Sequence, residues 1–184
     1  TVTLASTTNN FLLLDFNGGA QTLGGGGEVV FSGNGVNSIV RPTNSGTLTI
    51  GPGITIRSIG TGGGTVGSPG LGLVNQGTIS ADTGGGRITV TGGTTGARWT
   101  NTGTLRANGG TLDLGGFWNN SGGTILVAAG TFDISGTVTT GQLGTLVNTG
   151  GTTVLNGTLE NTGTTLALTA AGTGTGSIRH SGTI

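Results

Sequence analysis

Apolar and polar residues alternate over short segments that are bounded by glycine. The aligned segments run from Gly86 to Gly92, from Gly110 to Gly116 and from Gly130 to Gly136, and their apolar positions are Ile88/Val90, Leu112/Leu114 and Phe132/Ile134. Alternation over four or five residues is typical of half-buried strands. No window carries the i, i+3, i+4, i+7 spacing of an amphipathic helix. The pattern therefore predicts an all-β protein built from short strands.

A second phrase, Asn-x-Gly-Thr followed by Leu or Ile, marks an internal repeat. Its copies start at Asn44, Asn75 and Asn101, with variants at Asn120, Asn148 and Asn161 and a last copy in which His180 replaces Asn. The gaps between copies run from 13 to 31 residues, which indicates a unit near 20 residues interrupted by loops. Such a unit is too short for a propeller blade and suits one coil of a solenoid, in which equivalent strands lie about 4.8 Å apart. We predict a right-handed parallel β-helix of about nine coils in 184 residues.

In such a solenoid, equivalent residues of successive coils stack into columns. The position two before the repeated Asn is always large and apolar, and it predicts an inward column of Leu73, Trp99, Trp118, Leu146, Leu159 and Ile178. The Asn position predicts a corner ladder of Asn75, Asn101, Asn120, Asn148 and Asn161, in which each amide bonds to its copies. The alternative is that each Asn is an independent turn former.

The repeat organises the chain into one domain over residues 1–184. Residues 1–40 follow the pattern less well, and we expect them to form irregular first coils. The segment 60–72 is rich in Gly and Pro, and we expect it to be a loop that protrudes from a coil. We expect the chain to be a mature segment or a fragment of a longer solenoid.

Composition narrows the possible partners. Glycine supplies 44 of the 184 residues, and only 7% of residues are charged. Six arginines balance six acidic residues, so no basic face for nucleic acid is predicted, and no apolar run reaches the length of a membrane span. There is no Cys, so disulfides and thiol chemistry are excluded. We expect no membrane insertion and no cofactor.

Candidate chemistry is sparse. Asp113 and Asp133 occupy equivalent outward positions, and their expected separation of about 5 Å matches the carboxylates of retaining glycosidases. The same pair is a candidate Ca²⁺ site, and the third interpretation is two solvated carboxylates with nothing basic aligned beside them. His180 is a candidate general base, but its place in the Asn column favours a corner role. The arginines fall at different repeat positions and are interpreted as scattered solubilising charges.

Two further patterns lack a supporting context. The glycine runs 24–27 and 62–64 are not followed by Gly-Lys-(Ser/Thr), so no phosphate loop is predicted. The Thr-x-Thr phrases at Thr47, Thr89 and Thr137 would suit a flat ice-binding face, but Asp113 and Asp133 interrupt the equivalent places.

The Asn-x-Gly-Thr-(Leu/Ile) and Gly-Gly-Thr-Leu-x-Leu phrases of residues 40–184 resemble the β-strand repeats of large bacterial surface proteins: autotransporter passengers, filamentous-haemagglutinin-like adhesins and extracellular fibre proteins. The resemblance implies a structural, extracellular, non-enzymatic protein with a possible glycan or host-surface ligand. Because uncapped solenoid ends expose strand edges, we also expect self-association into filaments. The alternatives are a polysaccharide-binding or polysaccharide-cleaving β-helix and, as a minor one, an ice-binding β-helix.

Overall fold

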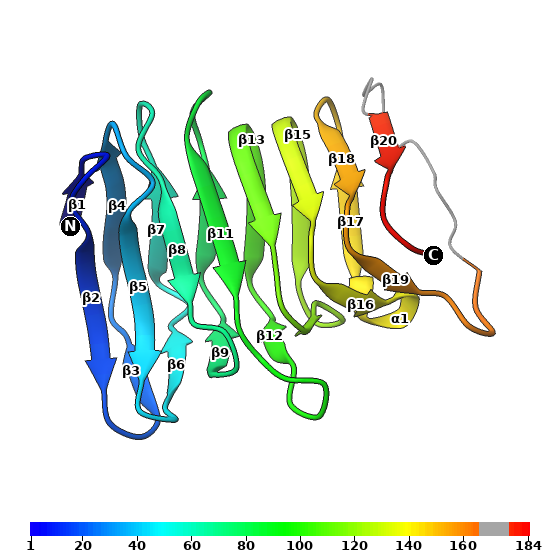
Figure 1. Ribbon diagram of the computed structural model, residues 1–184, viewed down its shortest axis with the longest axis horizontal. Helices are drawn as coiled ribbons and strands as arrows, with labels where there is room; N and C mark the ends of the chain where they lie inside the picture. The colour runs from blue at the N-terminus through cyan, green and yellow to red at the C-terminus, as the bar shows by residue number, and fades with distance from the viewer. Residues whose placement is uncertain (166–176) are drawn as a thin grey trace.

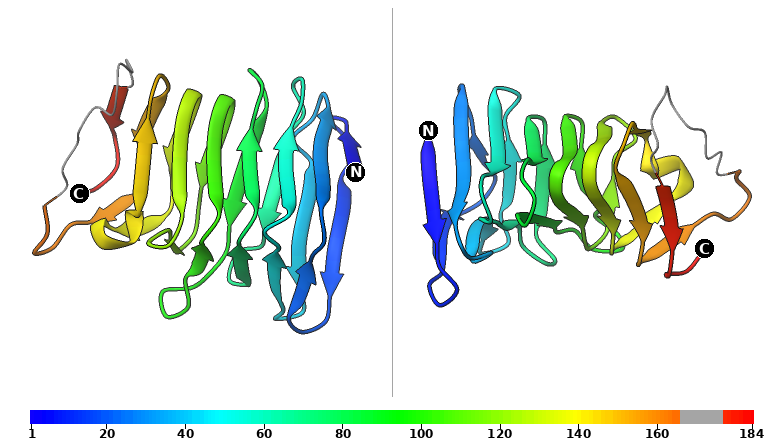
Figure 2. Two further views of the ribbon diagram at one scale, coloured as in Figure 1. Left: turned by 180° about the vertical axis from the view of Figure 1, so that it is seen from behind. Right: turned by 90° about the horizontal axis from the view of Figure 1, so that it is seen from above.

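The chain winds into a solenoid of about seven turns, in which short parallel strands stack along the long axis of a rod (Figure 1). This computed structural model describes residues 1–165 and 177–184, with the backbone alone at positions 177 and 178. The two termini lie toward opposite ends of the rod (Figure 2). A complete coil has three strand segments, one on each of three faces of the rod, and in two coils the first two segments form one continuous strand.

Face one begins each coil. Its strands are β1 (Val2–Ser6), β4 (Gly27–Gly33), β7 (Ile54–Ser58), β10 (Thr78–Ala81), the first halves of β13 (Thr104–Leu114) and β15 (Thr124–Ile134), and β17 (Thr145–Asn148). Face two contains β2 (Leu12–Asn17), β5 (Ser38–Thr43), β8 (Gly64–Gly67), β11 (Arg87–Thr91), the second halves of β13 and β15, β18 (Thr152–Leu155) and β20 (Ser177–His180).

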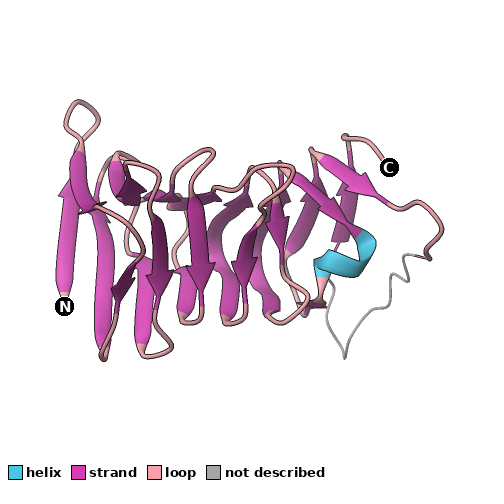
Figure 3. Ribbon diagram, turned by 90° about the horizontal axis from the view of Figure 1, so that it is seen from below, coloured by secondary structure: helices cyan, strands magenta, loops and turns pink. Residues whose placement is uncertain are grey.

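Face three closes each coil. Its strands are β3 (Gln21–Leu23), β6 (Thr47–Ile50), β9 (Gly72–Asn75), β12 (Trp99–Asn101), β14 (Trp118–Asn119), β16 (Thr137–Thr139) and β19 (Thr158–Glu160). One short helix, α1 (Thr140–Leu143), follows β16 and begins with a capping box between Thr139 and Gln142 (Figure 3). All pairings between the named strands are parallel, as the repeat predicts.

The prediction of nine coils is wrong because the coils are longer than the repeat phrases suggest. The Cα partners Val2 and Val29 are 27 residues apart, whereas Leu105 and Ile125 are 20 apart. The phrase also occurs at more than one kind of corner. Asn44 lies between faces two and three, whereas Asn75 lies between faces three and one. Gaps of 31, 28 and 13 residues therefore include a change of corner and do not measure one coil.

Residues 60–72 do not form a protruding loop, which corrects the sequence prediction. They contain β8, which pairs with β5 on one side and β11 on the other. A side chain at Gly64 would clash with the carbonyl oxygen of Ser38, so glycine is required where the backbones approach. Residues 1–40 hold β1 to β4 and the start of β5, and β1 and β2 pair in continuous register with the next coil.

The core is a narrow tube filled by the inward residues of the three faces. Fully buried side chains include Phe31, Ile56, Ile79, Leu105 and Phe132. Because successive strands lie in register, each inward residue packs mainly on its equivalents above and below. The alternation seen in the sequence therefore corresponds to inward and outward positions of the strands.

Candidate functional site

Three asparagines form a buried ladder at the corner between faces three and one. The Nδ2 of Asn75 donates to the Oδ1 of Asn101 at 2.6 Å, and the Nδ2 of Asn101 donates to the Oδ1 of Asn120 at 2.6 Å. Asn120 in turn donates to the carbonyl oxygen of Leu143 in α1 at 2.8 Å. All three side chains are buried. The ladder is therefore confirmed over these members, and it runs in one direction along the axis.

The predicted ladder is wrong at its other two members. Asn148 ends β17 on face one, and its Oδ1 accepts the backbone N–H groups of Gly150 and Gly151. Asn161 follows β19, and its Oδ1 accepts the hydroxyls of Thr140 and Thr164. The helix α1 occupies the corner after β16 and interrupts the column. At these two positions the alternative interpretation, an independent turn former, describes the asparagine better.

The two tryptophans lie in one inward column of face three. Trp99 and Trp118 are Cα partners, their ring centroids are 6.3 Å apart, and both are fully buried. The next members are Leu73, on one side, and Val138 and Leu159, on the other. The Trp99 indole N–H donates to the carbonyl oxygen of Gly115 at 3.0 Å. The column is a packing feature and presents no aromatic surface to solvent.

Two predicted members of the tryptophan column belong elsewhere. Leu146 is the Cα partner of Ile125 on face one, and Ile178 is the Cα partner of Thr153 on face two. Both belong to copies of the repeat phrase that lie at a different corner. The phrase alone gave the correct spacing from the Asn but could not show which face the copy belongs to.

The Asp113/Asp133 pair lies on face two and is more enclosed than the sequence suggested. The two residues are Cα partners, and their side chains are only 8% and 13% exposed. The guanidinium of Arg87 lies 2.5 Å from the Oδ2 of Asp113 and 3.9 Å from the Oδ2 of Asp133. The prediction that nothing basic lies beside the pair is therefore wrong, because Arg87 reaches Asp113 from two residues before its register partner Thr89.

Hydrogen bonds occupy the remaining oxygens of the pair. The Ser135 hydroxyl donates to the Oδ1 of Asp113, and the Asn156 amide donates to the Oδ1 of Asp133 at 2.7 Å. Burial raises the pKa of Asp133, and the Asp113 charge raises it further, against the opposing effects of the Asn156 hydrogen bond and Arg87. Within the described residues, no group of three or more His, Cys, Asp or Glu side chains could hold a metal ion.

Several arginines form ion pairs between adjacent coils, whereas their positions in the sequence predict scattered solubilising charges. Arg41 pairs with Asp15 at 2.9 Å and Arg57 pairs with Glu28 at 3.1 Å, each across one coil boundary. The Arg57 hydrogen bond lowers the pKa of Glu28. Arg98 lies over the Phe117 ring, 5.7 Å from its centroid, in a cation–π contact. Sequence spacing missed these pairs because coils of unequal length conceal which residues are neighbours.

His180 and the threonines do not assemble a site. His180 is exposed at the end of β20 and is the Cα partner of Leu155, outside the Asn column. Thr47 and Thr137 lie on face three, whereas Thr89 lies on face two, so the Thr-x-Thr phrases do not share one surface. Face one carries an unforeseen column of in-register threonines: Thr55, Thr78, Thr104, Thr124 and Thr145. The shared position after Asn-x-Gly could have indicated two of them, at Thr78 and Thr104.

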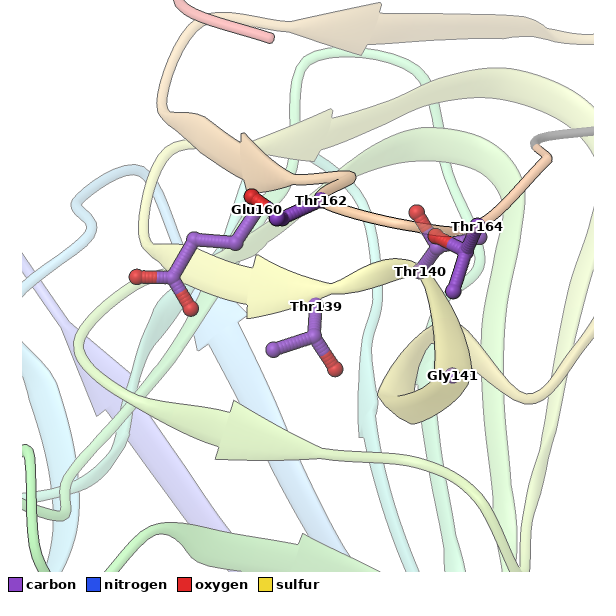
Figure 4. A pocket seen from close by; sticks show the side chains of 6 residues that line it. All are labelled: Thr139, Thr140, Gly141, Glu160, Thr162 and Thr164. Atoms are coloured by element: carbon purple, nitrogen blue, oxygen red, sulfur yellow. The ribbon is translucent and has the colours of Figure 1, made fainter.

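A hollow of about 450 Å³ lies beside α1 (Figure 4). Its lining is formed by Thr139, Thr140, Gly141, Glu160, Thr162 and Thr164. The Thr140 and Thr164 hydroxyls both bond to Asn161, and the Glu160 carboxylate points away from them (Figure 4) and pairs with Arg98 at 3.4 Å. The hollow thus offers hydroxyl groups and one engaged carboxylate, and it lacks an acid–base pair.

No helix in the described part of the chain is long and apolar enough to cross a membrane. Comparison with protein-family models, curated proteins and solved structures gave no match to this chain. The fold alone defines its class: it is a β-solenoid repeat protein.

Proposed function

We propose that this chain is a structural, non-enzymatic segment of an extracellular fibre, adhesin stalk or matrix filament on a bacterial surface. The observation that carries the proposal is the parallel stacking of successive coils on three faces, with backbone ladders, the three-member Asn ladder and the Trp column parallel to the axis. Such a stack resists bending and unwinding because each coil is bonded to its neighbours along its strands. We further propose that the coil is right-handed, which is the usual sense of parallel crossovers.

The mechanism is mechanical. Stacked buried side chains fill the tube, and ion pairs such as Arg57 with Glu28 join one coil to the next on the outside. The lack of lysine leaves only six arginines as tryptic sites, and Arg98 is held within the fold with 16% of its side chain exposed. These features support a stiff, protease-resistant rod that assembles end to end.

Electron microscopy with fibre diffraction of the purified chain tests this proposal. We expect elongated particles that join into filaments, with a reflection near 4.8 Å along the filament axis. Discrete rods that stay monodisperse at high protein concentration would contradict assembly. Specific binding or cleavage of a polysaccharide that is lost in Asp113→Asn would favour the alternative, although Arg87 already engages that carboxylate.

A further inference from the structure

The coil formed by β1, β2 and β3 has a backbone edge that no other described strand pairs. β1 pairs with β4, β2 with β5 and β3 with β6, each on one side only. On this coil Phe11 and Leu13 are 66% and 49% exposed, and the core residues Leu14 and Phe16 are half-buried. Free N–H and C=O groups beside open apolar side chains form a template for another strand.

Charge adds specificity to this edge. Asp15 uses its Oδ1 to pair with Arg41, and no described residue bonds to its Oδ2. At the far end of the rod, Arg179 in β20 is exposed and has no ion pair among the described residues. An acid at one end and a base at the other are complementary if two copies meet head to tail.

The register of face two relates these two residues. One column of Cα partners runs through the rod as Leu13, Ile39, Thr65, Thr89, Asp113, Asp133, Val154 and Arg179. A copy that continued this column would place its Arg179 opposite Leu13 of the next copy. Arg179 would then lie two residues before the position opposite Asp15.

The rod already contains an ion pair with this geometry. Arg87 lies two residues before Thr89, the Cα partner of Asp113, and its guanidinium reaches the Asp113 carboxylate at 2.5 Å. The arginine is on the earlier coil, the acid is on the later coil, and both are on face two. Arg179 and Asp15 of two stacked copies would repeat this offset, order and face.

We propose that a second copy of this chain docks its β20 on β2 in this register, and that an Arg179–Asp15 ion pair between copies fixes the register. This inference rests on the proposed function, because it specifies the joint of the filament. Apolar contacts and backbone bonds hold the joint together, while the ion pair selects one alignment, since a slip of one residue would turn every side chain to the opposite face.

A disulfide between copies tests the register. In the same register, two residues before that column, Ser177 would lie opposite Phe11, at about 4.8 Å between parallel neighbours, within the Cα separation of a disulfide. The chain has no Cys, and the two positions lie in the last and first coils, so Phe11→Cys with Ser177→Cys can bridge only between copies. We expect a ladder of covalent oligomers on a non-reducing gel. The matched control, Leu12→Cys with Ser177→Cys, is one residue out of register and should cross-link several-fold less.

Charge reversal in the cross-linking variant tests the ion pair. At low salt, adding Arg179→Asp should reduce the covalent oligomers several-fold, and adding Asp15→Arg as well should restore them. Thr183→Asp, an acid placed at the same end outside face two, should have little effect. Circular dichroism melting of each variant monitors folding.

The outcomes separate the two proposals. If filaments form but Phe11→Cys with Ser177→Cys does not cross-link, the proposed register is wrong and the fibre proposal still stands. The same holds if the control, Leu12→Cys with Ser177→Cys, cross-links equally well. Filaments that cross-link as expected but ignore Arg179→Asp overturn the role of the ion pair. A chain that stays monomeric under all conditions overturns self-association itself, and with it the joint.

Discussion

The guanidinium of Arg98 donates to the carboxylate of Glu160 at 3.4 Å, although 62 residues separate them in the chain. The same guanidinium donates to the carbonyl oxygen of Thr137 at 2.9 Å and lies over the ring of Phe117. Phe117, Thr137 and Glu160 belong to three successive coils that follow the coil of Trp99. One side chain thus connects four coils lengthwise.

Replacing this side chain should loosen the last coils. Arg98→Gln removes a charge-assisted hydrogen bond and the cation–π contact, and we expect a loss of about 1–2 kcal/mol in the free energy of unfolding. Arg41→Gln is the matched control, since its ion pair with Asp15 is about one-third exposed on both sides and should contribute less than about 1 kcal/mol. Urea unfolding with hydrogen exchange checks both variants. Equal losses, or faster exchange in β7 rather than β16 and β19, would contradict the bridging role.

The Asn ladder should be sensitive at its centre. Asn101→Leu removes the donor to Asn120 and the acceptor for Asn75, so buried polar atoms lose their partners. We expect a loss of about 2–3 kcal/mol. Asn148→Leu changes an asparagine that the repeat phrase treats as equivalent but that lies outside the ladder, and it should cost about 1 kcal/mol. Similar losses in the two variants, measured by urea unfolding, would mean that stacking of the amides adds nothing beyond turn formation.

The sequence predicted the strand type, the parallel stacking and the inward place of both tryptophans, because these follow from local alternation and a short repeat. It did not predict which face a given copy of the phrase occupies. Any corner of the coil needs a tight turn, and Asn-x-Gly supplies one wherever it occurs, so Leu146 and Asn148 were aligned with residues of another corner.

The polar contacts were the least predictable part. Arg87 meets Asp113, and Arg98 meets Glu160, only because coils of different length bring them together. Such pairs depend on the three-dimensional register and on side-chain reach, which the spacing along the chain does not contain. The strand β8 was missed for a related reason: its glycines suggest a loop, yet close backbone approach requires them within a strand.

Protonation of Asp133 at low pH should remove the destabilisation that its buried charge causes. Burial raises its pKa above the unfolded value of about 3.9, so the folded state binds the proton more readily than the unfolded state. The charged carboxylate therefore destabilises the rod fully above its folded pKa, and the cost disappears as the pH falls below the unfolded pKa. We expect Asp133→Asn to raise the free energy of unfolding at pH 7 and to leave it unchanged near pH 3, as measured by urea unfolding. A loss at pH 7 would show that the charge is net favourable.

Glu28 should behave in the opposite way. The Arg57 hydrogen bond lowers its pKa, so its contribution to stability is present above the unfolded pKa of about 4.3 and is lost as the pH falls through the folded pKa. We expect Glu28→Gln to lower the midpoint of thermal unfolding at pH 7 in low salt, with a smaller effect at 1 M salt because the pair is partly exposed. If the variant melts like the parent at pH 7 in low salt, the ion pair between these coils contributes no stability.

The tryptophan column offers a direct test of the register. Trp118 is fully buried between Trp99 and Val138, so Trp118→Ala should leave a cavity and cost about 3–5 kcal/mol. Trp99→Leu introduces the residue type of its column neighbour Leu73. It should lower the free energy of unfolding less than Trp118→Ala does, although it removes the hydrogen bond to Gly115. Each single variant leaves one tryptophan, whose fluorescence should be blue-shifted in the folded state and shift to the red only on unfolding. A red-shifted native spectrum, or ready quenching by acrylamide, would place the tryptophans at the surface and refute the inward column.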